Sequence, residues 1–269
     1  MKKILFFWLL LLIPTGLMGA PQTPRILALT PHVCEILYAI GAAEQVVGGV
    51  AYCDYPEAAK SLPRVGSYNG INVEAALRLK PSIAIVMSRN VKGVAMLEKM
   101  GVSVVVSNPT GFERMFADIL RLGELSQHQH EATVLVDQLQ ARLQRVRALP
   151  RSNTAVFYEL WHDPLLTAGK SSFINDVIVA AGGRNIFSDI NLETPHVNVE
   201  AVMRAKPELI VIPLEKRNIQ ERQAFWQGWF GKGKVQFVAI NPDLLHRPGP
   251  RLLDGLELLQ QALSQVENP

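Results

Sequence analysis

After residue 20 the chain alternates between apolar runs with strand character and longer stretches with helical spacing. Four apolar runs are bounded by polar or turn-forming residues: RILAL (25–29), VSVVVS (102–107), AVFYEL (155–160) and VQFVAI (235–240). Such runs predict buried strands, and their separation by helical stretches is typical of parallel sheets built from strand and helix units. The pattern therefore predicts an α/β fold.

One helix-and-strand unit occurs twice. INVEAALRLKPSIAIVM (71–87) aligns without gaps with VNVEAVMRAKPELIVIP (197–213), and Asn, Val, Glu, Ala, Arg, Lys and Pro recur in register. Each copy predicts a short helix that begins at an asparagine cap, ends before a proline and leads into a buried strand. Each copy is preceded by a segment that predicts a helix ending in glycine, over 35–48 and 175–188. We therefore expect two α/β lobes of related design.

Residues 128–149 contain no glycine or proline and repeat apolar residues at helical spacing. They predict one helix, roughly 33 Å long, between an N-terminal lobe (21–127) and a C-terminal lobe (150–269). A stiff helix in place of a short flexible hinge implies a clamp that closes only slightly. The expected fold is two related α/β lobes, joined by a single long helix, with a ligand cleft between them.

Residues 1–20 have the pattern of a secretory signal peptide. Lys2 and Lys3 precede an apolar run, and the segment ends in small residues at Gly19 and Ala20. The apolar core is too short to cross the ~30 Å of hydrocarbon that a membrane anchor must span. We expect cleavage of this segment and release of the mature protein into the periplasm.

The composition and the short motifs of the chain exclude several classes of function. The formal net charge of +3 is spread along the chain, so nucleic-acid binding is not expected. The cysteines, Cys34 and Cys53, could form a disulfide in an oxidising compartment or remain two buried thiols. GSYNG (66–70) is not a G-x-S-x-G elbow, and AGKSS (168–172) lacks the first glycine of a phosphate loop. Without a local signature of a nucleophile and its base, no enzyme, catalytic residue or cofactor is expected.

Six segments resemble the helical-backbone class (class III, TroA-like) of periplasmic substrate-binding proteins, most closely its cobalamin-binding members. They are PRILALTPHVCEILYAIG, AYCDYP, GSYNGINVEAALRLKPSIAIV, DPLLTAGKSSFINDVI, HVNVEAVMRAKPELIVI and DLLHRPGPRLLDGL. The resemblance covers essentially the whole mature chain. It implies a monomeric component of an ABC importer that captures cobalamin (vitamin B12) or a related corrinoid and delivers it to a permease dimer in the inner membrane. Relatives that bind ferric siderophores or haem share these segments, so those ligands are the alternatives.

The resemblance also places ligand-binding side chains in loops that follow the strands, where open α/β sheets bind their ligands. They are Tyr52, Tyr68, Trp161, Thr194, Asp243, His246 and Arg247. Aromatic rings could cover a flat corrin face, while Asp243 and Arg247 could face its polar groups or merely pair with each other. Tyr68 and Thr194 stand where the cobalamin-binding members carry tryptophan, which leaves less apolar wall for a corrin.

Glu74 and Glu200 occupy equivalent places in the two repeats. They resemble the glutamates through which such proteins dock onto arginines of two transporter subunits. Two exposed carboxylates, one per lobe, can meet a two-fold symmetric partner at two points. Each could instead serve only to offset the dipole of its own helix.

A receptor for bare Zn²⁺ or Mn²⁺ is the second alternative. Its ligands would have to converge from both lobes, and the candidates are His32, His162, His196, His246 and Asp243. None of them forms a close-spaced ligand pair on one element, so no protein metal site is expected.

Overall fold

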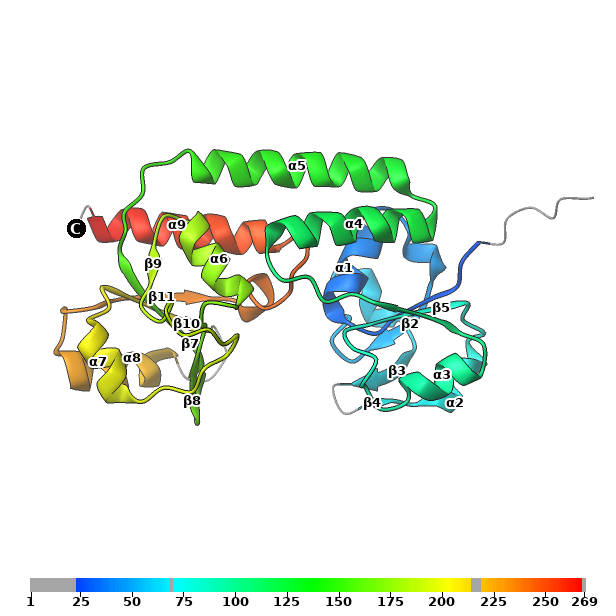
Figure 1. Ribbon diagram of the computed structural model, residues 1–269, viewed down its shortest axis with the longest axis horizontal. Helices are drawn as coiled ribbons and strands as arrows, with labels where there is room; N and C mark the ends of the chain where they lie inside the picture. The colour runs from blue at the N-terminus through cyan, green and yellow to red at the C-terminus, as the bar shows by residue number, and fades with distance from the viewer. Residues whose placement is uncertain (1–22, 68–69, 214–218, 268–269) are drawn as a thin grey trace, which may run out of the picture.

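The computed structural model describes residues 23–67, 70–213 and 219–267 (Figure 1). Two α/β lobes lie side by side, and a long helix runs along one side of both. The predicted fold class is therefore confirmed. The predicted signal peptide lies outside the described residues. Among the described residues, no helix combines the length and the apolar character needed to cross a membrane.

The N-terminal lobe is built on a six-stranded sheet in the order β4-β3-β2-β1-β5-β6. Neighbouring strands run parallel except β3 and β4, which pair antiparallel. The strands are β1 (Ile26–Ala28), β2 (Val46–Val50), β3 (Arg64–Ser67), β4 (Gly70–Ile71), β5 (Ile83–Val86) and β6 (Ser103–Val106). The helices are α1 (Pro31–Ala39), α2 (Val73–Arg78), α3 (Val94–Lys99) and α4 (Phe112–Ser126).

The C-terminal lobe has a sheet in the order β11-β10-β7-β8, with β9 also paired to β7. Here β10 runs parallel to both neighbours, as β5 does in the N-terminal lobe, while β7 and β8 form an antiparallel hairpin. The strands are β7 (Ala155–His162), β8 (Leu165–Thr167), β9 (Arg184–Asn185), β10 (Leu209–Pro213) and β11 (Gln236–Ile240). The helices are α6 (Phe173–Ala180), α7 (Val199–Ala205), α8 (Ile219–Phe230) and α9 (Leu252–Glu267).

The duplicated sequence unit forms α2 with β5 and α7 with β10. Asn72 Oδ1 accepts a hydrogen bond from the backbone N–H of Ala75 at 3.0 Å, and Asn198 Oδ1 accepts one from Ala201 at 2.9 Å. Each bond satisfies one of the donors that a helix start leaves without an intrahelical partner. The same local chemistry thus begins the same element in both lobes.

The helices before the repeats are shorter than the sequence pattern predicts. The helix expected over 35–48 is wrong at its end, because α1 stops at Ala39 and residues 46–50 form β2. Gly41 has a φ of 83°, a left-handed conformation that suits glycine and takes the chain out of the helix. In the C-terminal lobe, α6 likewise ends at Ala180 and β9 follows. Val46 and Val50, beyond Gly41, are buried because they enter the sheet as part of β2.

Helix α5 (Gln129–Arg147) connects the lobes and lies against α4 of one lobe and α9 of the other (Figure 1). Val136 and Leu139 on its buried face belong to one apolar cluster that also contains side chains of β1 and α9. Arg142 donates to both carboxylate oxygens of Glu257 on α9, at 2.9 and 2.7 Å. The two lobes therefore share a continuous core through α5.

Candidate functional site

A cavity of about 310 Å³ lies between the two lobes. Residues that follow β1, β2, β5 and β6 line it from the N-terminal lobe, and those after β1 form the first turn of α1. Because these strands are parallel, their carboxyl ends open toward one side, where ligands of open α/β sheets bind. The lining residues are Pro31, His32, Tyr52, Met87, Asn108, Pro109, Thr110, Phe173, Glu193, Pro242, Asp243, His246, Arg247 and Pro248.

The structure brings some of the predicted ligand-binding residues together and leaves others apart. Those that line the cavity are Tyr52, Asp243, His246 and Arg247. Trp161 lies at the end of β7, is 44% exposed and stacks on His162 with ring centroids 5.6 Å apart. Thr194 is exposed beside Glu193, which does line the cavity. Tyr68 lies outside the described residues.

Two histidines that line the cavity are engaged by hydroxyl groups. His32 Nε2 lies 2.8 Å from Ser107 Oγ, and His246 Nε2 lies 2.8 Å from Tyr158 Oη. Burial lowers the pKa of each imidazole to about 4, so both rings are uncharged at neutral pH. In the part of the chain that the structure describes, no group of three or more His, Cys, Asp or Glu side chains is placed to hold a metal ion.

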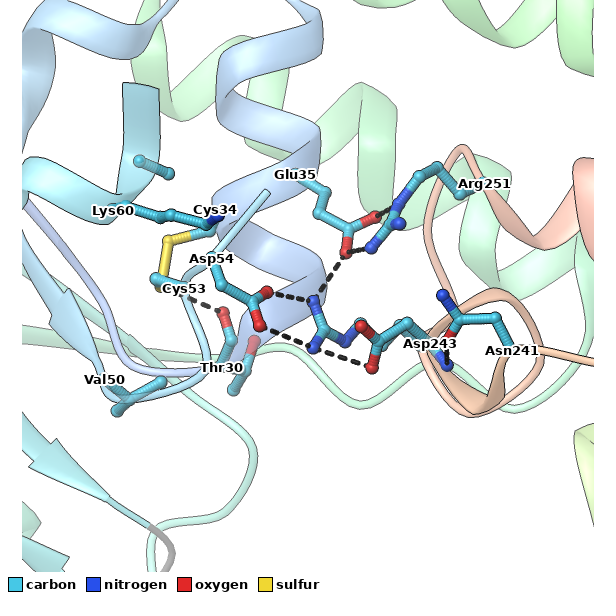
Figure 2. Close-up of polar contacts among 12 residues, drawn as sticks. Thr30, Cys34, Glu35, Val50, Cys53, Asp54, Lys60, Asn241, Asp243 and Arg251 are labelled. Carbon is cyan, nitrogen blue, oxygen red and sulfur yellow. Dashed lines mark hydrogen bonds and ion pairs between the residues drawn. A yellow bond between two sulfur atoms is a disulfide. The ribbon is translucent and has the colours of Figure 1, made fainter. Parts of the chain in front are cut away.

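Arg247 links the two lobes beside the cavity. Its partners Glu35, Asp54 and Asp243 are labelled in Figure 2. Its Nη1 donates to Glu35 Oε1 at 3.0 Å and to Asp54 Oδ1 at 2.7 Å, both in the N-terminal lobe, and Nη2 lies 2.8 Å from Asp243 Oδ1. Arg251, from the same segment between β11 and α9, donates to both oxygens of Glu35, at 2.9 and 2.5 Å. We call these side chains the interlobe network: Glu35, Asp54, Asp243, Arg247 and Arg251.

Arg247 and Asp54 keep their charges at the lobe interface. Arg247 and Glu35 are only 6% and 3% exposed. Burial acts to lower the pKa of Arg247 and to raise that of Asp54, but their hydrogen bond and opposite charges outweigh it. The pKa of Arg247 is therefore raised and that of Asp54 lowered. Replacing Arg247 would remove the hydrogen-bond donor of Asp54, whereas without Asp54 the guanidinium would still be paired with Glu35 and Asp243.

A disulfide joins Cys34 to Cys53, with the Cα atoms 5.7 Å apart. Of the two states that the sequence allowed, the structure therefore has the disulfide and not two buried thiols. Glu35 directly follows one cysteine and Asp54 the other. The cross-link therefore holds both carboxylates near the same point (Figure 2). It also fixes the loop that carries Tyr52, the residue before Cys53.

Sequence reasoning missed Glu35, Asp54 and Arg251. Two signals were present: each acid stands next to a cysteine, and Arg251 lies four residues after Arg247. Neither signal shows that the acids and the arginines meet across the lobes.

Glu74 and Glu200 are exposed in the first turns of α2 and α7. Figure 1 shows these helices in different lobes, on the side of the molecule away from α5. Glu74 lies 3.1 Å from Arg78, one helical turn further on, and both side chains are largely exposed. Both glutamates are thus exposed residues of helices that lie on one side of the molecule.

Known proteins are similar to this chain in sequence and in architecture. Residues 26–246 match the family described as periplasmic binding protein. A vitamin B12-binding protein of Yersinia pestis (strain Pestoides F) is 30% identical over 263 residues, which cover 96% of this chain and 93% of that relative.

Solved structures agree with the sequence matches. The periplasmic vitamin B12 binding protein BtuF of Vibrio cholerae matches with a TM-score of 0.80 and 27% identity, over 93% of this chain and 100% of that one. The periplasmic haem binding protein HutB of Vibrio cholerae matches with a TM-score of 0.77 and 20% identity, over 92% and 100% of the two chains. At that identity the likeness to HutB shows a shared fold alone.

Proposed function

The chain belongs to the periplasmic binding protein family, and we propose that it captures cobalamin or a related corrinoid between its lobes and delivers it to an ABC permease. Proteins of this family bind a solute and do not transform it, so the chain is not an enzyme. Removal of residues 1–20 during export to the periplasm is part of the proposal.

The chemistry of the cleft is the observation that carries the corrinoid proposal. Its lining combines the apolar or aromatic side chains of Tyr52, Met87 and Phe173 with polar groups such as Asp243. A corrin has flat faces and a rim of amides, so rings can pack against a face while donors and acceptors bind the rim. Cobalt held by the ligand's own nitrogens needs no protein metal cluster, which suits a site where His246 Nε2 is engaged by a tyrosine.

The cavity volume bears on how a corrinoid would sit. At about 310 Å³ the cavity is at the small end of the ~300–1,000 Å³ range of ligand sites. A corrinoid would place only one edge in it, and the remainder would project out of the cleft. We assign Tyr68, Trp161 and Thr194 to this projecting part. In support of this assignment, the Trp161 ring is exposed at the end of β7.

Calorimetric titration of the mature protein tests the ligand. Cyanocobalamin should bind with one-to-one stoichiometry at micromolar or lower concentration, as expected for a preformed cleft. Parallel titrations with a ferric siderophore, haemin and Zn²⁺ cover the alternatives. Absence of cyanocobalamin binding at micromolar concentration, or stoichiometric binding of one of the others in its place, would rule out the corrinoid proposal.

We further propose that Glu74 and Glu200 dock the two lobes onto a permease dimer. In support of this role, each glutamate is exposed on a helix of its own lobe, and both helices lie on the side of the molecule away from α5. The dipole explanation accounts for each glutamate alone, but a symmetric partner accounts for their duplication.

A further inference from the structure

We propose that the cleft selects its ligand by charge, admitting neutral or cationic solutes and rejecting anionic chelates, because the interlobe network and Glu193 give it an excess of carboxylates. The inference rests on the proposed function in that it takes this cleft as the ligand site.

Arg247 is the one cationic side chain among the described residues that line the cavity, and its guanidinium is already engaged. Asp54 and Asp243 lie 2.7 and 2.8 Å from its two terminal nitrogens, and Glu35 also accepts from it. With only 6% of the residue exposed, the guanidinium cannot swing out to meet a new partner. An anionic ligand would have to displace one of the protein's own carboxylates to reach it.

Carboxylates outnumber cationic groups around the cavity. The interlobe network contains three carboxylates and two guanidinium groups, and Glu193 adds a further carboxylate to the lining. His32 and His246 contribute no positive charge, because burial keeps both rings neutral at neutral pH. Low-dielectric walls focus such an excess into the cleft, where it acts on an entering ligand.

This charge separates the ligand classes that the fold can hold. Haem carries ionised propionates, and catecholate complexes of ferric iron are multiply charged anions. Cyanocobalamin and many hydroxamate complexes of ferric iron are neutral overall. Repulsion of the anions discriminates between them without a contact specific to the corrin ring.

The test compares two corrinoids of the same shape. One is cyanocobalamin, and the other is its monocarboxylic acid, in which one peripheral propionamide is hydrolysed to a carboxylate. Calorimetry on the mature protein gives the ratio of their Kd values. We expect the acid to bind roughly tenfold more weakly or worse, because its added charge meets the carboxylates of the cleft.

Variants locate the cause of the discrimination. Asp243→Asn and Glu193→Gln each remove one carboxylate that lines the cavity, with little change in size, and each should shrink the Kd ratio by about threefold. Glu57→Gln is the matched control, because Glu57 is an exposed acid on the neighbouring 3₁₀ helix (Glu57–Ser61) and does not line the cavity. It should leave the ratio unchanged.

The Kd ratio separates a charge effect from a change of lobe geometry. A loosening of the interlobe network in Asp243→Asn would weaken the binding of both corrinoids alike and leave the ratio unchanged. Equal binding of the two corrinoids to the unmodified protein, or an unchanged ratio in both cleft variants, refutes charge selection and leaves the proposed ligand intact. Failure of both corrinoids to bind refutes the proposed ligand. Charge selection is then decided by a neutral ferric hydroxamate against an anionic ferric catecholate, and preference for the anion contradicts it.

Discussion

Single buried histidines make this protein sensitive to acid. Burial lowers the pKa of His32 and His246 to about 4, against about 6.5 in an unfolded chain. Between these pKa values the unfolded chain binds protons that the native protein does not. The contribution of these histidines to the free energy of unfolding is therefore complete above pH 6.5 and falls as the pH drops toward 4, by up to about 1.4 kcal/mol per pH unit for each histidine.

Urea denaturation at pH 7.5 and 5.5 measures this slope, in a range where most carboxylates remain ionised. His246→Gln can keep a hydrogen bond to Tyr158 without titrating, so its unfolding free energy should depend less on pH. His130→Gln, at an exposed position on α5, is the control and should keep the full slope. Equal slopes for the two variants would show that His246 is not the source.

At the same scale, the site could be predicted from sequence only where a local motif marks it. Tyr52 and Arg247 belong to segments with a family resemblance, and both line the cavity. The bond from Arg247 to Glu35 spans 212 residues and joins separate lobes. No local spacing reports such a contact, because it arises from the way the lobes pack.

Among the elements, the disulfide between α1 and the loop after β2 should contribute measurably to the free energy of unfolding. It closes a segment with a sequence separation of 19 residues, and a cross-link of that length contributes about 3 kcal/mol by restricting the unfolded chain. We expect Cys34→Ala with Cys53→Ala to lower the free energy of unfolding by about 2–4 kcal/mol and to weaken ligand binding, because the loop with Tyr52 and Asp54 loses its anchor.

Denaturation with and without a reductant checks the disulfide prediction. Reduction should shift the unfolding midpoint of the unmodified protein toward that of the double variant, and it should leave the double variant unchanged. A midpoint that is the same in the reduced and oxidised protein would contradict the assigned role.

Long helices and strands could be predicted from the sequence more accurately than short ones. The helix expected over 128–149 is observed as Gln129–Arg147, because its buried face repeats an apolar residue at nearly every turn. The strands β4 and β9 have only two residues each, too few to show any periodicity. The end of α1 was misplaced because the apolar residues of β2 continue its pattern past Gly41.

In the whole molecule, two connections restrain the lobes. The apolar cluster continues from lobe to lobe through α5, and the interlobe network ties the lobes beside the cavity. Opening the cleft would separate the charges of the network, which is costly at a largely buried interface. A clamp restrained in this way moves little, so a partner must recognise the relative position of the lobes more than a large closure.

Recognition by both lobes at once predicts how the docking glutamates combine. Glu74→Gln or Glu200→Gln alone should weaken binding to the permease by about tenfold, the equivalent of about 1.4 kcal/mol, because one contact of the symmetric pair remains. The double variant should reduce solute uptake to background in cells that lack the unmodified protein. Its ligand affinity in solution should be unchanged, because neither residue lines the cavity. Glu131→Gln, on α5 at the opposite side of the molecule, is the control and should transport normally. Normal uptake by the double variant would show that the glutamates serve only their own helices. Unchanged ligand affinity of the double variant would show that the chain is folded, so that a loss of uptake cannot come from misfolding.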